Sequence, residues 1–291
     1  MPTTLPSPPQ AWQRLSIPSR PLSPTLSVRR ALPVPDRRLV GAWTFLDHIG
    51  PVPAEAPALE VGAHPHIGLQ TATWLFEGEI LHRDSLGTAQ TICPGQLNLM
   101  TAGHGIAHSE EGRAGALHGV QFWIALPAEA ERIAPAFEHL PELPSGSIGG
   151  AELRVFIGQL GALRSAATVH SPLVGAELRI TGPATLPLRP DFEHALMVVH
   201  GELRVEGEPL VPGELLYLGG SREQLRLQGE ALAVLIGGEP LPEPRVLWWN
   251  FVARDWETIR EARRAWLAGE ARFPEVPGYP GERLSCPDLP G

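Results

Sequence analysis

Turn-forming residues interrupt this chain so often that they limit what it can fold into: glycine supplies 31 and proline 32 of its 291 residues. Both residue types favour tight turns and break long helices. Short apolar runs of strand length, such as residues 70–78 and 117–126, lie between the turns, and they contain the β-branched and aromatic residues that strands favour. The sequence therefore predicts an all-β fold of many short strands.

A repeated turn pattern indicates how these strands are grouped. Gly78-Glu79-Ile80 is followed by Pro94-Gly95, and Gly201-Glu202-Leu203 is followed by Pro212-Gly213. Each copy has the order strand, glycine turn, strand, Pro-Gly turn, strand. Matching apolar flanks favour a true repeat over coincidence, so two similar all-β domains are predicted.

The segments between the repeats set the expected domain boundaries. Residues 128–134 follow Pro127 and carry glutamates early, which predicts a short helical connector. Residues 141–150 are rich in proline, serine and glycine and indicate a linker. We therefore expect an N-terminal domain over residues 1–140 and a C-terminal domain over residues 141–291.

One amphipathic helix is predicted near the C-terminus, over residues 255–267. Asp255 can cap its first turn, arginines lie late in the segment and Gly269 follows it, which are the usual signals of a helix start and stop. The residues that recur at helical spacing are Trp256, Ile259, Ala262 and Trp266. We expect this stripe to pack against a sheet rather than to bind a ligand.

Composition excludes several classes of function. All 23 basic residues are arginine, which excludes a lysine Schiff base, a lysine general base and a P-loop lysine. The net charge of −9 argues against direct nucleic-acid binding. Two cysteines, Cys93 and Cys286, are too few for a disulfide scaffold. No apolar run long enough for a membrane span and no signal core are found, so we expect no membrane contact and a cytoplasmic protein.

Histidine is the residue type in this chain best suited to bind a metal or transfer a proton, and two short histidine motifs stand out. They are His64-Pro65-His66 and His108-Ser109-Glu110. Residues i and i+2 of a strand point to the same face, so each motif presents two donors side by side. If the two strands are neighbours, three imidazoles and one carboxylate converge, a set that suits a first-row divalent metal. A single His-x-His pair is weak evidence, whereas two such pairs around the turns are more specific.

The repeat supplies an internal control for this metal site. At the same offsets from its glycines, the second copy has Pro187, Arg189, Arg226 and Gln228. These residues do not form an equivalent ligand set. One metal in the first domain is therefore predicted, and the second domain is interpreted as a structural or partner-binding copy.

The other histidines of the first half are expected to have structural roles. His82 follows a turn and is expected at the surface, whereas His104 and His118 are placed beside the site or in its supporting shell. His48 is expected to form a local hydrogen bond.

Three segments give the chain a resemblance to a known family: HPHIGLQTATWLFEGEILHRDS, PGQLNLMTAGHGIAHSE and LHGVQFWIALP. They resemble the pirin family, two-domain members of the cupin superfamily, as do FLDHIGP upstream and GGEPLPEPRVLWWNFVARDWETI downstream. The resemblance covers roughly residues 28–270. It implies a bicupin: two antiparallel, jelly-roll-like β-barrels with a short linker helix and a C-terminal helix.

The resemblance also implies which residues hold the metal. The family's His-Pro-His and His-x-Glu pairs map onto His64, His66, His108 and Glu110. One position departs from the pattern, because Gln70 stands where many pirins have a glutamate four residues after the second histidine. That residue is not a ligand in pirin-like proteins, so we expect the site to survive with altered hydrogen bonding around it.

The activity implied by the resemblance is that of a quercetin 2,3-dioxygenase. The flavonol and O₂ would be the partners, and Glu110 would accept the proton of the flavonol 3-hydroxyl as general base. The ring would then open to a depside with loss of carbon monoxide. Fe²⁺ is the expected metal, and the donor set also suits Mn²⁺, Ni²⁺, Co²⁺, Cu²⁺ and Zn²⁺.

Two other functions stay open at this point. Some pirins are non-enzymatic transcriptional co-regulators that bind a protein partner in a metal-dependent way, and the −9 charge favours a protein over DNA as that partner. The site could also act on a small molecule other than a flavonol. We expect a monomer, because two barrels can pack on one another within the chain.

Overall fold

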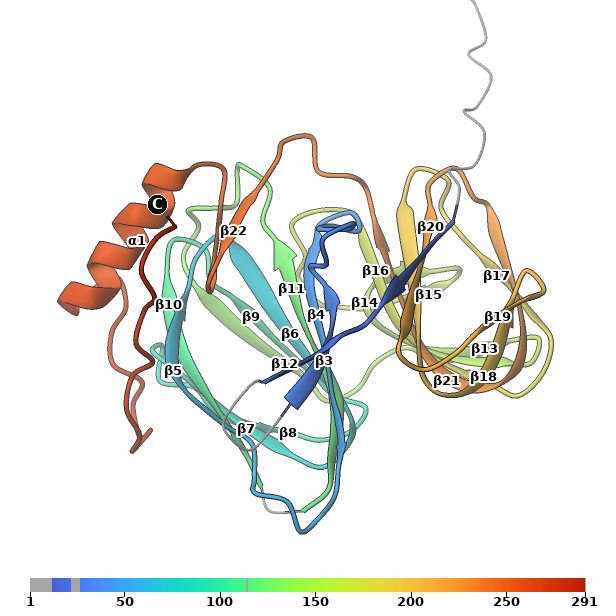
Figure 1. Ribbon diagram of the computed structural model, residues 1–291, viewed down its shortest axis with the longest axis horizontal. Helices are drawn as coiled ribbons and strands as arrows, with labels where there is room; N and C mark the ends of the chain where they lie inside the picture. The colour runs from blue at the N-terminus through green and yellow to red at the C-terminus, as the bar shows by residue number, and fades with distance from the viewer. Residues whose placement is uncertain (1–11, 22–26, 114, 291) are drawn as a thin grey trace, which may run out of the picture. The chain divides into compact units, whose positions relative to one another are not determined.

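The computed structural model describes residues 12–21, 27–113 and 115–290, and these residues form 23 strands and one helix (Figure 1). The strands pair antiparallel in three larger sheets and one two-stranded sheet. The prediction of an all-β fold is therefore confirmed. None of the helical segments among these residues has the length and hydropathy of a membrane span.

The chain divides into two compact units that are discontinuous in sequence. Unit 1 comprises the described parts of Met1–Ser19, Arg29–Leu46 and Glu142–Pro240. Unit 2 comprises the described parts of Arg20–Val28, Asp47–Pro141 and Leu241–Gly291. The consecutive domains 1–140 and 141–291 stay a prediction, and the compact units differ from them chiefly because Leu241–Gly291 belongs with the first half of the chain.

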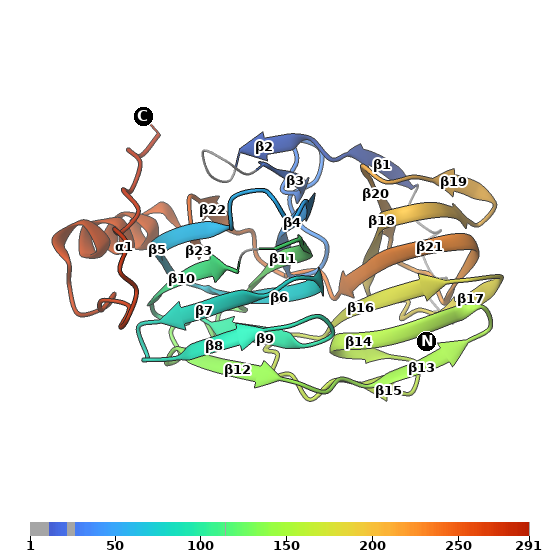
Figure 2. The same ribbon diagram turned by 90° about the horizontal axis from the view of Figure 1, so that it is seen from below.

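Unit 2 contains the histidine motifs, and its strands belong to two sheets (Figures 1 and 2). Ser19 and residues 29–32 and 43–46 of the larger sheet are counted with unit 1. The four-stranded sheet has the order β5 (Glu60–His66), β10 (Ile106–Gly112), β7 (Ile80–Asp84), β8 (Ala89–Ile92). The seven-stranded sheet has the order β12 (Ala136–Leu140), β9 (Leu97–Thr101), β6 (Leu69–Glu77), β11 (Leu117–Ala125), β4 (Trp43–Val52), β3 (Ser27–Leu32), β2 (Ser19–Pro21). A short hairpin joins β22 (Val246–Trp248) to β23 (Phe251–Ala253).

Unit 1 is built on one ten-stranded sheet. Its main path is β1 (Gln13–Ser16), β20 (Glu214–Gly219), β18 (Glu193–Val205), β21 (Gln224–Gly238), β16 (Leu173–Ile180), β14 (Ala151–Leu160), β13 (Ser145–Ile148). Beside this path, β15 (Leu163–Arg164) pairs with β14, β17 (Ala184–Pro187) with β21, and β19 (Glu208–Leu210) with β18. The inward positions of these strands form a core of leucine, valine, isoleucine and alanine side chains, as expected for sheets with one buried face.

The repeated turns adopt the same backbone conformation in both units. Gly78 and Gly201 have φ values of 86° and 88°, and Gly95 and Gly213 have 81° and 94°. Side chains are strained in this left-handed region. At Gly201 a Cβ atom would also lie 2.2 Å from the carbonyl oxygen of Glu230. The repeat inferred from the sequence is therefore a repeat of backbone geometry.

The predicted C-terminal helix is confirmed as α1 (Trp256–Ala268). The Asp255 side chain accepts a hydrogen bond from the backbone N–H of Thr258, and Gly269 ends the helix with φ 66°. Trp266 is buried, whereas Trp256 is 38% exposed. Ile259 and Ala262 are buried as well, so the expected stripe is correct at three of its four residues and wrong at Trp256.

The predicted connector helix over residues 128–134 is wrong. Its hydrogen bonds run from Ala130 N to Pro127 O and from Ile133 N to Ala130 O, which is the i to i+3 spacing of turns. Pro127 and Pro135 lie at either end of the segment, so too few residues remain between them to nucleate a helix. In addition, a helical conformation is unfavourable for the residue that precedes Pro135.

The predicted linker over residues 141–150 also contains a strand. Residues Ser145–Ile148 form β13, which pairs with β14 through registers such as Gly146↔Leu153. The segment therefore adds an edge strand to unit 1.

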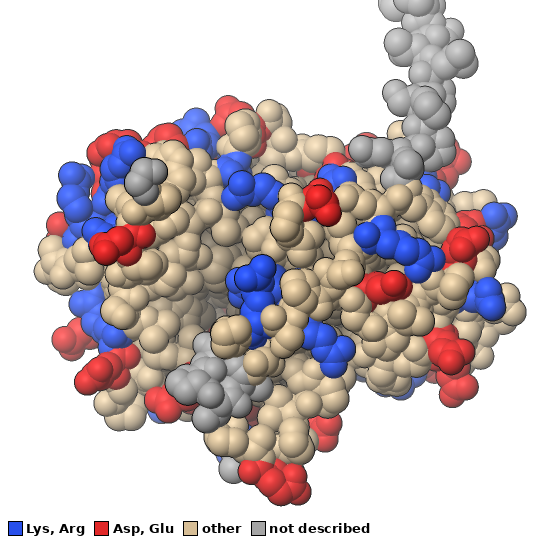
Figure 3. All heavy atoms as spheres, viewed as in Figure 1, with Lys and Arg blue, Asp and Glu red and all other residues tan. Residues whose placement is uncertain are grey.

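On the face drawn in Figure 3, acidic and basic side chains are interspersed over the described residues.

Candidate metal centre

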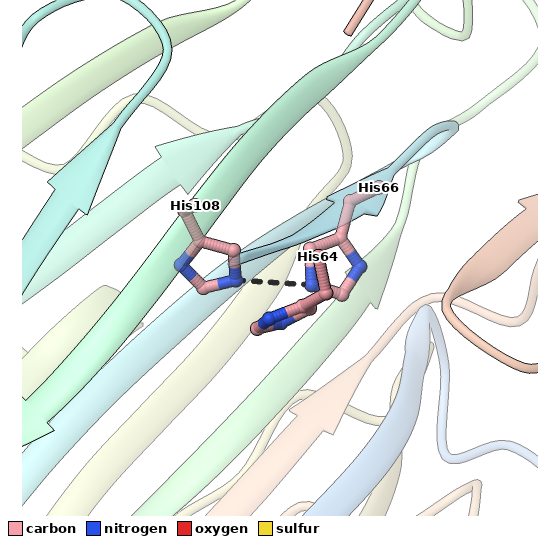
Figure 4. A group of neighbouring side chains, drawn as sticks. All are labelled: His64, His66 and His108. Carbon is pink, nitrogen blue, oxygen red and sulfur yellow. Dashed lines mark hydrogen bonds between the residues drawn. The ribbon is translucent and has the colours of Figure 1, made fainter. Parts of the chain in front are cut away.

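Three of the four predicted ligands come together on neighbouring strands of unit 2. His64 and His66 lie on β5, His108 lies on β10, and His108 pairs directly with His64. One ring nitrogen from each of the three lies within 4.8 Å of the others. Figure 4 shows the three rings converging on one point, and Nε2 of His66 lies 3.1 Å from Nε2 of His108. The structure therefore brings together three of the four residues selected by their spacing, and their role as metal ligands stays a prediction.

Strand alternation explains why the histidines face inward together. Their neighbours Ala63 and Ala107 point to the opposite face and join the apolar cluster that contains Ile259 and Trp266 of α1. Both ribbon views show α1 beside β5 and β10 (Figures 1 and 2). The helix thus covers the outer face of the strands that carry the histidines. Along these strands, alternate residues pack against the helix or point toward the histidine cluster.

Backbone carbonyls orient two of the rings. Nδ1 of His64 lies 2.8 Å from the carbonyl oxygen of Gly62, and Nδ1 of His66 lies 2.9 Å from that of Asn250. A carbonyl can only accept, so each Nδ1 carries the proton and donates. Each Nε2 is then the ring atom with a free lone pair, as a metal ligand requires.

A chain of two hydrogen bonds orients the third ring. Nδ1 of His108 lies 3.4 Å from Nδ1 of His82, and Nε2 of His82 lies 3.1 Å from a carboxylate oxygen of Asp84. The carboxylate accepts from His82 Nε2–H, so His82 Nδ1 accepts from His108 Nδ1–H. The lone pair of His108 Nε2 is then directed at the cluster, which is the arrangement of a carboxylate–histidine support for a metal ligand.

The placement of His82 corrects the sequence analysis, which expected it at the surface. The residue is only 3% exposed, its ring stacks on Phe137 with centroids 4.5 Å apart, and it pairs with Glu110 across β7 and β10. Asp84 is fully buried. Burial alone would raise the pKa of Asp84, but its hydrogen bond to His82 and the backbone N–H of Thr88 bring the pKa below its usual value.

We expect Asp84→Asn to lower the affinity for a divalent metal by about 10- to 100-fold, because the substitution removes the charge that fixes the tautomers of His82 and His108. Competition with a chromophoric chelator measures this affinity. Asp84 also accepts backbone N–H groups, so His82→Gln is a second test, and the exposed Asp191→Asn is the control. Wild-type affinity in both variants would contradict the proposed support.

Electrostatics keeps the three histidines in the neutral form that binds metals. Burial lowers the pKa of His64 to about 4. Burial, and then the mutual repulsion of the protonated rings, lowers the pKa values of His66 and His108 well below the usual range. At neutral pH the cluster therefore presents lone pairs rather than positive charges.

Glu110, the fourth predicted ligand, lies on β10 beside the cluster but outside the group of donor atoms within 4.8 Å of one another. A bulge lies between His108 and Glu110 in the pairing with β5. The side chain is 8% exposed, and burial raises the pKa of its carboxyl. Among the described residues its hydrogen-bond donor is Thr73 Oγ1 at 3.4 Å, and that hydroxyl lies closer, at 2.8 Å, to Gln121.

The donor set fits a divalent cation. Three neutral imidazole nitrogens and a buried carboxylate with one long hydrogen bond leave lone pairs that a cation would satisfy. Two nearby polar residues have other partners: Gln70 donates to Thr101 Oγ1 at 2.9 Å, and Asn98 Oδ1 lies 2.7 Å from Nδ1 of His139. The edge of Trp123 packs on His66, with centroids 5.0 Å apart.

The remaining histidines fall into two kinds. His48 and His118 are buried and face each other, with Nε2 atoms 2.8 Å apart. His104 is exposed and its ring contacts the carbonyl oxygen of Ile133. The contacts of His104 and His118 are consistent with the structural roles expected for them. The hydrogen bond found for His48 is not the local one that was expected, because its partner His118 lies 70 residues away in the sequence.

The second copy of the repeat carries leucines where the first carries ligands. His82 and Val205 each lie four residues after the repeat glycine, and they pair with Glu110 and Leu227. Two residues before Glu110 and Leu227 on the same strands, His108 pairs with His64 and Leu225 pairs with Leu186. Counting along the sequence had selected Pro187, Arg189, Arg226 and Gln228, one position from these inward residues. The structural equivalents also have no metal-binding atoms.

Comparison with known proteins places the fold and the cluster in a wider context. The family described as Pirin matches residues 25–124, and the Pirin C-terminal cupin domain matches residues 173–273. A Pseudomonas aeruginosa protein provisionally named quercetin 2,3-dioxygenase PA1205 is 45% identical over 285 residues, which cover 96% of this chain and 90% of that protein. A pirin-like protein of Caulobacter vibrioides is 38% identical, over 90% of this chain and 94% of its own.

Solved structures agree with these sequence matches. A crystal structure of quercetin 2,3-dioxygenase from Acinetobacter baumannii matches with a TM-score of 0.92 at 43% identity, and the match covers 96% of both chains. The fold class predicted from the sequence, an all-β bicupin, is confirmed by this match together with the C-terminal cupin domain.

Proposed function

This chain belongs to the pirin family, and from that premise we propose that it is a metal-dependent dioxygenase that opens the ring of flavonols such as quercetin. The overall reaction consumes one O₂ and yields a depside and carbon monoxide. The observation that carries the proposal is the convergence of His64, His66 and His108 in a buried site of a chain that is 43% identical to a structure of that enzyme.

In this proposal, His64, His66, His108 and Glu110 hold one divalent ion, with Fe²⁺ as the expected metal. When bound, the ion supplies Lewis acidity toward an anionic substrate oxygen and access to O₂ chemistry. The chain's contribution is to keep the three rings neutral and to fix their orientation through the contacts of each Nδ1 atom.

Glu110 is proposed to accept the proton of the flavonol 3-hydroxyl. Burial raises the pKa of its carboxyl, which makes the ionised form a stronger base than an exposed glutamate. The long contact to Thr73 leaves its oxygens open to a new partner. The proton would move from the substrate oxygen to a carboxylate oxygen of Glu110, leaving the substrate as an enolate.

Burial also limits side reactions in this proposal. His66 has no exposed surface and His108 is 1% exposed. Trp123 and Phe137 pack on the rings of His66 and His82. A water-poor site strengthens the attraction between the deprotonated substrate and the cationic centre.

The proposal is tested by adding quercetin aerobically to protein reconstituted with Fe²⁺ under anaerobic conditions. We expect the flavonol absorbance to decay catalytically and carbon monoxide to accumulate in equal amount. Protein with the exposed His104→Ala substitution is expected to behave as wild type. Decay no faster than in buffer with free Fe²⁺, or flavonol loss without carbon monoxide, would contradict the proposal.

A further inference from the structure

Unit 1 contains a pocket of about 370 Å³ that belongs to no part of the metal centre. Most of its lining residues are apolar, polar atoms contribute a large share of the wall, and one buried histidine is among the lining residues. The lining includes Leu160, Leu173, Val174, Leu188, Phe192 and His194. We call it the His194 pocket. Its size lies in the range of small-molecule sites.

Glycines on neighbouring strands make room for the His194 ring at the edge of this pocket. His194 on β18 pairs with Gly237 on β21, and Gly237 pairs in turn with Val174 on β16. A Cβ atom on Gly237 would lie 2.6 Å from Cδ2 of His194 and 3.1 Å from Cγ1 of Val174. The His194 ring and the Val174 side chain thus occupy the space that a side chain at Gly237 would take. On its other side, His194 pairs with a second glycine, Gly219 on β20.

One ring nitrogen of His194 lacks the hydrogen bond that a buried polar atom needs. The residue is 1% exposed, and its Nδ1 atom has no hydrogen-bond partner among the described residues. The ring contact found for it is with Phe192, at a centroid distance of 5.9 Å. Burial, the main cause, lowers the pKa of His194 to about 4, so the ring is neutral at pH 7. An unsatisfied buried polar group is destabilising unless a ligand or water supplies the missing partner.

The charges at the pocket rim argue against an anionic ligand. Arg189 is stacked on Phe192, 4.1 Å from the ring centroid, and it is already paired with Asp191 and Glu239. Because its guanidinium is already paired with these two carboxylates, Arg189 is not a free cationic partner for a carboxylate or phosphate ligand. A neutral ligand needs no such partner.

We propose that the His194 pocket binds a neutral single-ring phenol whose hydroxyl forms a hydrogen bond with the imidazole of His194. A hydroxyl can donate or accept, so it satisfies the neutral ring in either tautomer. The aromatic ring suits walls made of leucine, valine and Phe192. The space is ample, since cavities of about 150 Å³ already hold benzene. This site is independent of the function proposed for unit 2.

The test is a titration of the full-length chain with p-cresol and, separately, with toluene, which lacks the hydroxyl. We expect p-cresol to bind at least about tenfold more tightly, the ratio that one hydrogen bond to a buried group provides. We also expect p-cresol to shift the ring ¹⁵N resonances of His194 in the wild-type protein. His194→Phe should reduce the preference for p-cresol to less than about twofold, because its ring cannot form the hydrogen bond.

His200→Phe is the matched control, since His200 is an exposed histidine on the same strand. This variant should keep the wild-type preference. Equal affinity for p-cresol and toluene in the wild type, unshifted His194 resonances at saturating p-cresol, or a preference that survives in His194→Phe would each overturn the proposal. The resonance measurement needs no variant, so it stands even if His194→Phe does not fold.

Discussion

Replacing His66 by alanine is expected to lower the affinity for a divalent metal by more than about 100-fold, because loss of a ligand exceeds the effect of losing a ligand's support. His66 is fully buried, its Nε2 faces that of His108 at 3.1 Å, and its Nδ1 is fixed by the Asn250 carbonyl. No other side chain is positioned to replace it within the described cluster. Isothermal titration with Zn²⁺ or anaerobic Fe²⁺ measures the change.

Thermal unfolding gives a second measurement of the same effect. A ligand that binds the folded state raises its stability in proportion to the logarithm of ligand concentration over Kd. We therefore expect added metal to raise the unfolding temperature of the wild type and of the exposed His104→Ala control, but not of His66→Ala. Retention of tight binding by His66→Ala, or an equal loss in His104→Ala, would refute the assignment of the cluster.

Replacing Glu110 by glutamine is expected to reduce flavonol turnover by about 10²- to 10⁴-fold, the usual contribution of a general base. The amide keeps the shape and can offer one oxygen, but it cannot accept the 3-hydroxyl proton. We expect weaker metal binding in this variant, so turnover is compared at saturating metal. Stopped-flow absorbance of quercetin at fixed O₂ gives the rate.

The neighbouring residue supplies a matched control for this substitution. Glu111 lies next to Glu110 on β10, but its carboxylate pairs with Arg83 at 2.9 Å on a partly exposed surface. Glu111→Gln should keep wild-type turnover. If Glu110→Gln turned over as fast as Glu111→Gln at saturating metal, Glu110 would not be the base.

The part of the site that the sequence predicted depends on strand alternation alone. His64 with His66, and His108 with Glu110, are i, i+2 pairs, and a regular strand sends both members to one face. The bulge between His108 and Glu110 interrupts this regularity in the pairing with β5. The pairing of β5 with β10 then brings the two motifs into register, with His108 opposite His64. The sequence left this pairing as a condition, and the structure supplies it.

The support of the cluster could not be found in the same way. His82 and Asp84 reach His108 only through the pairing of β7 with β10, and an isolated histidine after a turn carries no signal of that register. Asn250 contributes a backbone carbonyl, which leaves no mark in the residue type. An i, i+2 His-Asp pair on a strand was the available hint, since its two side chains share a face with the candidate ligands.

Counting residues along the repeat was reliable for the turns and not for the inward positions. Offsets counted outward from the repeat glycines differ by one residue between the copies, since His108 lies 13 residues after Gly95 and Leu225 lies 12 residues after Gly213. Strand register corrects this difference and replaces Arg226 by Leu225 and Leu227. The compact units differ from halves of the sequence for a related reason: α1 packs with Ala63 and Ala107, far earlier in the chain.

The most direct test of the account is a crystal structure of the metal-reconstituted protein with anomalous data collected at the absorption edge of that metal. We predict one anomalous peak per chain, within bonding distance of the Nε2 atoms of His64, His66 and His108 and of a carboxylate oxygen of Glu110. A peak bound by other residues, or full metal loading without a peak at this cluster, would contradict the central claim.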